Sequence, residues 1–132
     1  MAINFDNALG IHVDALRVRT QRAEMLATNL ANVDTPNYKA KDIDFREALK
    51  AATDNQSGNL NATHQKHFQI GANSPANPLV QYRTTVQDSL DGNTVDEQIE
   101  QAQFMQNAVQ YQATLEFLGG KFQSLTKALR GD

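Results

Sequence analysis

The side chains that could do chemistry lie near the middle of the sequence. His64 and His67 stand close together, but the chain has no cysteine and no nearby carboxylates that would complete a metal-ligand set. Asp42 and Asp44 alternate on a segment that reads as extended, so they point alike. Two carboxylates without further oxygen ligands are weak grounds for a calcium site. We therefore read the two histidines as surface loop residues and expect no metal.

The sequence offers no better support for nucleophilic or cofactor chemistry. None of the serines lies in a nucleophile elbow, and there is no glycine-rich phosphate loop. The run 89–93 combines Gly92 with acidic residues but lacks the EF-hand spacing. His12 falls on an expected helix, where it is most simply an interface or core-edge residue. The sequence therefore predicts a protein that is not an enzyme, with no catalytic residues and no cofactor.

The bulk composition excludes several other classes of protein. At 132 residues the chain is one domain's worth of sequence, and its net charge of −3 argues against a general nucleic-acid binder. No apolar run approaches the roughly 20 residues of a membrane span, and the N-terminus does not resemble an ordinary secretory signal. The absence of cysteine fits either a cytosolic protein or an exported one that must not cross-link on the way.

An apolar stripe near the C-terminus is the strongest periodic pattern. Its steps alternate between four and three residues, which is a heptad seam typical of a helix packed on other helices. The members are Phe104, Ala108, Tyr111, Leu115, Leu118, Phe122, Leu125 and Leu129. The run Thr94-Val95-Asp96-Glu97 matches a capping box with Thr94 as the N-cap, so we expect a helical segment over 94–132. Gly119-Gly120 indicates either a flexible point or the close approach of a neighbouring helix.

A weaker stripe of the same kind marks an N-terminal helical segment over 1–33. It consists of Leu9, Val13, Leu16, Ala23, Ala27 and Leu30. A second apolar row beside it, which includes Ile11 and Val18, widens the apolar face beyond a two-stranded seam. Taken alone, such stripes are most often intramolecular core. Both stripes are terminal, however, and the polar middle could not cover them, so the surplus apolar surface predicts assembly with other chains.

The first helix must end at a sharply defined turn, Thr35-Pro36-Asn37-Tyr38. Thr35 precedes a proline and is pushed out of the α region, while Asn37 stands where a type II turn needs a positive φ. The segment 34–93 is turn-rich, with an extended stretch at 42–45, a short helix at 45–52, a loop at 53–63, and strand candidates at 68–70 and 79–82. We predict a mainly α fold in which two long terminal helices form a coiled-coil-like pair around this irregular middle with short β elements.

The sequence around this turn resembles the N-terminal signature of the bacterial flagellar axial proteins, the rod, hook and hook-junction family. The residues that carry the signature are Asn29, Asn32, Thr35, Pro36, Asn37 and Tyr38. The family usually has glycine where this chain has Asn37, and asparagine also tolerates the left-handed conformation. The segments 22–32, 38–45, 89–96, 111–113 and 118–122 extend the resemblance over nearly the whole chain, most closely to proximal rod subunits. The loop 53–63 is unmatched.

The resemblance implies a structural subunit of the basal-body proximal rod. Such subunits are exported by the flagellar type III apparatus without a cleaved signal and polymerise helically across the periplasm, with their terminal helices packed as a coiled coil. The implied partners are further copies, other rod proteins, the rod-base adaptor and the membrane-ring protein, and the two stripes become an assembly seam. The alternative is a small soluble helical adaptor or export chaperone that binds partner helices in the cytosol.

One further pair of residues fits an export role that the resemblance implies. In exported rod and hook subunits, a phenylalanine followed four residues later by an apolar residue is similar to the motif read by the export gate. Phe45 and Leu49 have this spacing, and one face of a short helix would present both. Phe5 and Leu9 form a rival pair. The competing interpretation is that Phe45 and Leu49 only anchor the short helix on the subunit.

Overall fold

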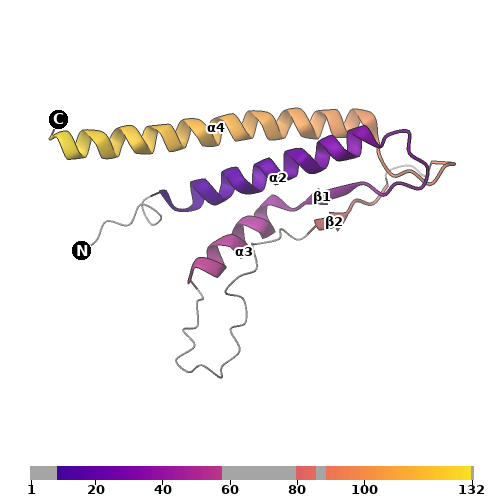
Figure 1. The fold of residues 1–132 in the computed structure, drawn as a ribbon, viewed down its shortest axis with the longest axis horizontal. Coiled ribbons are helices and arrows are strands. Elements are labelled where there is room, and N and C mark those ends of the chain that lie inside the picture. The colour runs from indigo at the N-terminus through magenta and orange to yellow at the C-terminus, as the bar shows by residue number, and fades with distance from the viewer. Residues whose placement is uncertain (1–8, 58–79, 86–88, 132) are drawn as a thin grey trace, which may run out of the picture.

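A computed structural model describes residues 9–57, 80–85 and 89–131 of the chain. Along the chain the elements are helix α2 (Ile11–Ala31), strand β1 (Lys41–Ile43), helix α3 (Phe45–Ser57), strand β2 (Val80–Tyr82) and helix α4 (Glu97–Arg130). The mainly α fold with long terminal helices and short β elements between them is confirmed (Figure 1). The histidine pair, the strand candidate at 68–70 and Phe5 of the rival export pair lie outside the described residues.

Helices α2 and α4 run antiparallel, side by side (Figure 1). The pairing is recorded by contacts whose residue numbers rise on one helix as they fall on the other: His12 with Phe117, Arg19 with Gln110, and Asn29 with Glu100. At 34 residues, α4 is about 50 Å long at ~1.5 Å per residue, and its C-terminal part extends past the start of α2. This end of α4 therefore has no helical neighbour among the described residues.

The start of α4 differs from the expected capping box. Asp96 is the N-cap, and its Oδ1 accepts hydrogen bonds from the amides of Gln98 (3.0 Å) and Ile99 (3.2 Å). Thr94 is engaged elsewhere, because its hydroxyl accepts the Ala40 amide at 2.7 Å. The expectation that Thr94 caps the helix was wrong because a contact distant in sequence takes its side chain.

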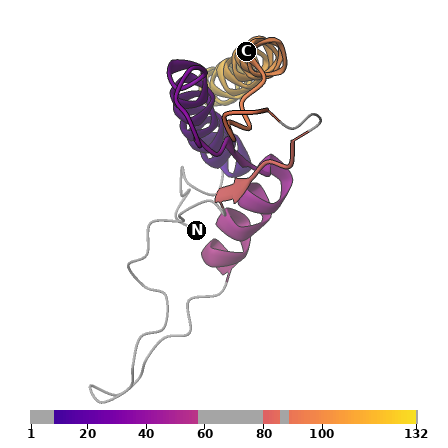
Figure 2. The ribbon, with the colours of Figure 1, turned by 90° about the vertical axis from the view of Figure 1, so that its right-hand side faces the viewer.

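The middle of the chain is attached to α2 by a small sheet and a helix. Strands β1 and β2 pair antiparallel, with Asp42 opposite Gln81. Ile43 and Ala48 pack with Val18 of α2 in a small apolar core, which Phe45 and Met25 flank. An end-on view places the sheet and α3 together on one side of the helix pair (Figure 2). The predicted short helix is confirmed, but α3 continues to Ser57 instead of ending near residue 52.

The turn after α2 has the predicted geometry. Asn37 has a φ of 60°, and it is the one non-glycine residue with positive φ in the described part of the chain. The Tyr38 amide donates to the Thr35 carbonyl at 3.3 Å, which closes the four-residue turn. Gly119 and Gly120 do not interrupt α4, and a Cβ atom added at either position would meet nothing within 4 Å. Any close approach to these glycines would have to come from outside the described residues.

Candidate functional site

The face of α4 that meets α2 is polar. Glu100, Asn107 and Thr114 follow one another at heptad spacing and are all buried. The Asn107 side-chain amide donates to the Arg19 carbonyl at 2.9 Å, and Gln103, between these positions, accepts from Arg22 at 2.8 Å. Side-chain hydrogen bonds therefore run along this helix contact, where a coiled coil usually has apolar residues.

A partly buried charge network connects this face to the sheet. Glu100 accepts from Asn29 (3.1 Å) and from Arg83, which also pairs with Asp42 at 2.7 Å. Asp42 in turn accepts the Nε of Arg22 at 2.9 Å. Burial alone would raise the pKa of Asp42, but hydrogen bonds from Arg22, Arg83 and the Ile43 amide lower its pKa below the ordinary value. The network thus connects α2, β1, α4 and the segment after β2.

The signature residue Asn29 lies at the centre of this junction and is fully buried. Its side-chain nitrogen donates to the Lys41 carbonyl (2.7 Å) and to Glu100, and its oxygen accepts the Lys41 amide (3.1 Å) and the Tyr38 hydroxyl (3.2 Å). All four hydrogen-bonding positions of the amide are filled. Burial raises the pKa of Tyr38, and the Glu100 charge adds to this effect.

The signature turn is docked on the run before α4. Asn93 is buried, and its side-chain nitrogen lies within 3.0 Å of the carbonyl oxygens of Asn32, Val33 and Thr35. The Asn37 amide donates to the Asp91 carbonyl at 2.9 Å, and Lys39 donates to the Gly92 carbonyl at 2.7 Å. The signature turn and the segment 89–96, which both carry the family resemblance, therefore hold each other in place.

The residues of the expected seam are half-buried or exposed, and part of the α4 stripe borders the polar helix contact. None of the seam residues is fully buried, and exposure reaches 37% at Phe104, 43% at Leu115 and 81% at Leu129. Phe104, Ala108 and Tyr111 of α4 line a groove of about 380 Å³ together with Ala23 and Thr20 of α2. We call the stripe from Phe104 to Leu129 the apolar flank of α4. Its role in assembly stays a prediction.

The other candidate residues have structural partners in the described part of the chain. Asp44 caps α3 by accepting the amides of Arg46 (2.8 Å) and Glu47 (3.1 Å), so it does not join Asp42 in one site. Phe45 is half-buried under the Arg19 guanidinium, 4.0 Å from its ring centre, and Leu49 is half-buried one turn later. These contacts agree with an anchoring role and leave the export role untested.

Two broader site classes find no support in residues 9–57, 80–85 and 89–131. No three histidine, cysteine, aspartate or glutamate side chains gather there as metal ligands. Nor does this part of the chain contain a helix with the length and hydropathy needed to span a bilayer.

Sequence reasoning missed the residues that hold the helices together. Glu100, Asn107 and Thr114 carry a usable signal, because polar residues at a strict seven-residue interval mark one helix face. That row was overlooked because the neighbouring apolar row has the same period and a stronger hydrophobic pattern. Arg83 and Asn93 lie outside regular structure, and nothing in their local sequence indicates a partner.

Comparisons with known proteins extend over the whole chain. Residues 9–39 match the family described as flagella basal body rod protein. A protein of Aeromonas hydrophila called flagellar basal body rod protein FlgB is 49% identical, with all of this chain and 99% of the relative aligned. Proteins of the same name from Escherichia coli K12 (41% identical, 98% of each chain) and Cereibacter sphaeroides (40% identical, 97% of this chain and 98% of the relative) are also similar.

Proposed function

The chain belongs to the FlgB family of flagellar basal body rod proteins, and we propose that it serves as a structural subunit of the proximal rod. In this proposal the subunit leaves the cytoplasm through the flagellar type III apparatus and polymerises helically in the periplasm. It joins copies of itself and other rod proteins, next to the rod-base adaptor and the membrane-ring protein. As a rod protein it is not an enzyme, and its work is to transmit torque.

The apolar flank of α4 is the observation that carries this proposal. The residues with which α4 meets α2 include polar ones such as Asn107. A single subunit leaves large apolar side chains of α4 exposed, on the flank (Phe104, Leu115, Phe122) and on other faces (Met105, Val109, Phe117). Contiguous exposed apolar surface of this kind is typical of protein interfaces. Contacts that join one face to a different face of the next subunit extend as a helix unless they close into a ring.

Complementation of a strain that lacks the chain tests the proposal. Basal bodies are purified from the complemented strain, and the protein is located by immunoblotting beside a cytoplasmic marker. We expect the protein in the basal-body fraction and restored swimming. Its retention in the cytosol of a motile strain would favour the adaptor or chaperone reading instead.

We also propose that Phe45 and Leu49 are read by the export gate before the subunit folds. A chain in transit has no Arg19 stacked on Phe45, so both side chains are free to enter an apolar groove. In a strain that cannot assemble rods, Phe45→Ala should reduce secretion into the medium at normal cellular levels, while Phe5→Ala should be secreted normally. The opposite pattern would assign the signal to Phe5 and Leu9.

A further inference from the structure

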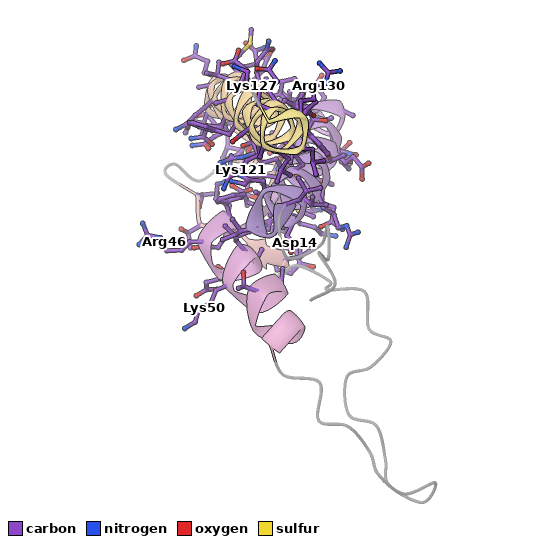
Figure 3. The ribbon with its side chains drawn as sticks, turned by 90° about the vertical axis from the view of Figure 1, so that its left-hand side faces the viewer. Asp14, Arg46, Lys50, Lys121, Lys127 and Arg130 are labelled. Carbon is purple, nitrogen blue, oxygen red and sulfur yellow. The ribbon has the colours of Figure 1, made fainter. Side chains whose placement is uncertain are left out.

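A polar pocket of about 560 Å³ lies between α2 and the elements of the middle segment, with Gln110 of α4 also in its lining. Arginines form much of its wall, with carboxylates beside them. The charged residues that line it are Arg19, Arg22, Asp42, Asp44, Arg46 and Arg83. Arg46 extends from α3 away from the helix pair, as does Lys50 (Figure 3).

The charges in this pocket are not balanced. Arg22 and Arg83 are held by Asp42 and Glu100, but no carboxylate of the described residues pairs with Arg19. The Arg19 guanidinium donates one hydrogen bond, from Nη1 to Gln110 at 2.6 Å, and lies over the Phe45 ring. Its Nε is buried without an acceptor. Burial lowers the pKa of Arg19, and the charge of Arg22 adds to this effect.

A guanidinium that is partly withdrawn from water without a counterion is costly to maintain. Its planar donor set matches a carboxylate, which it can bind with two parallel hydrogen bonds. A phosphate dianion fits less well, because Asp42 and Asp44 line the same pocket and would repel it. The pocket therefore suits one ligand oxygen pair with a single negative charge.

We propose that this pocket receives a carboxylate side chain from a neighbouring copy of the chain, with Arg19 as its partner. The inference rests on the proposed rod function. A second copy fits because the chain has a net charge of −3, with exposed carboxylates on its outer helical surfaces such as Glu24, Glu97 and Glu116. A helical assembly joins unlike faces, so the pocket on one copy meets a different surface on the next.

Four variants separate this role from an internal one. Arg19→Gln removes the charge, Arg19→Lys keeps it, and Gln110→Ala removes the internal acceptor of Arg19. Arg17→Gln is the matched control, because Arg17 is an exposed arginine on the same helix. Each variant is expressed in the strain that lacks the chain, and its amount in purified basal bodies is compared with its amount in cells. Thermal unfolding of each purified variant is measured in parallel.

We expect Arg19→Gln to lower basal-body content at least about tenfold, as the loss of a charged hydrogen bond does to an affinity. Arg19→Lys should fall between Arg19→Gln and wild type, because it keeps the charge but loses the planar donor pair. Gln110→Ala should lose much less content than Arg19→Gln, and Arg17→Gln should match wild type. Equal defects in Arg19→Gln and Gln110→Ala, or none in Arg19→Gln, would overturn the proposal. If wild type itself were absent from basal bodies, the rod function would fail and this inference with it.

A photo-cross-linker at the rim of the pocket identifies the occupant. Tyr82 lines the pocket and is largely exposed, so p-benzoylphenylalanine in its place should capture whatever enters. We expect an adduct between two copies of the chain that maps next to an acidic residue. An adduct with a different protein, or no adduct in assembled rods, would contradict a second copy as the occupant.

Discussion

Two adjacent faces of α4 differ in polarity and burial, and in our proposal one face serves the fold and the other serves assembly. The face toward α2 buries Glu100, Asn107 and Thr114. Glu100 and Asn107 form hydrogen bonds with α2, whereas the Thr114 hydroxyl donates to the Gln110 carbonyl of its own helix. The apolar flank beside this face exposes Phe104, Leu115 and Phe122. Buried polar groups cost much when mispaired, so they fix the register of the helix pair, whereas apolar surface adheres without strict geometry. Hydrogen bonds join α2 to α4, a small apolar core around Val18 and Ile43 attaches the middle segment, and the apolar flank stays uncovered by the described residues.

A charge on the apolar flank should have the largest effect. Leu115→Asp should abolish swimming and rod assembly. A carboxylate without a partner in an apolar interface costs about 2–5 kcal/mol, and the cost recurs at every subunit of the assembly. The monomer should be nearly unaffected, because Leu115 is 43% exposed there. Swimming, basal-body content and thermal unfolding are measured together, with Gln106→Asp on another exposed face as the control. Normal rods from Leu115→Asp would remove the flank from the assembly surface.

A change on the polar face should destabilise the monomer itself, unlike a charge on the apolar flank. Glu100→Ala removes a buried acceptor from both Asn29 and Arg83, and we expect a loss of about 2–3 kcal/mol in the free energy of unfolding of the monomer. Glu97→Ala, one turn earlier and exposed, should stay within about 0.5 kcal/mol of wild type. Denaturant unfolding of both variants gives the difference. A Glu100→Ala monomer as stable as wild type would mean that the polar face does not hold the helices.

Substitutions of Asn37 in the signature turn should change the stability of the monomer less. Asn37→Val should destabilise the monomer by about 1–2 kcal/mol, since a β-branched residue at φ 60° is strained. Asn37→Gly should be tolerated, because glycine adopts this conformation readily. Chemical unfolding and swimming radius measure the two effects. Equal stability of the two variants would contradict the left-handed conformation of residue 37.

The smallest expected effect is a pH dependence that originates at Asp42. The pKa of Asp42 is lowered in the folded chain, so the ionised carboxylate stabilises the fold. This stabilisation is complete above the pKa of the unfolded chain, about 3.9, and is lost as the pH falls through the pKa of the folded chain. Asp42→Asn should flatten this part of the stability curve. Thermal melts between about pH 5 and pH 2 compare the two proteins. An unchanged slope in Asp42→Asn would place the acid sensitivity elsewhere.

The parts of the structure that could be predicted from the sequence are determined by residues close together in the chain. The heptad stripe identified α4, and the X-Pro restriction with the left-handed tolerance of asparagine identified the turn at Asn37. The parts it missed depend on contacts between distant residues. Strands of three residues carry no periodic signal, so the pairing of β1 with β2 was not foreseen. Likewise, the partners of Arg83 and Asn93 are separated from them by up to 61 residues.

The apolar stripe of α4 predicted the helix but not the surface that packs on the apolar side chains. A heptad pattern indicates a helix with an apolar face, but it does not indicate which neighbour covers that face. Here the stripe and the polar row share one period on adjacent faces of α4, and α2 packs on the polar row. Only the three-dimensional arrangement separates the surface that packs on α2 from the one that the described residues leave exposed.

Single cysteines on adjacent faces of α4 test the central claim most directly. The chain has no native cysteine, so Leu115→Cys and Thr114→Cys can each be labelled cleanly with a maleimide. In the purified monomer Leu115→Cys should react and the buried Thr114→Cys should not. In purified basal bodies from motile cells, we predict that Leu115→Cys becomes protected. Equal labelling of Leu115→Cys in monomer and basal bodies would contradict the assignment of the apolar flank to assembly.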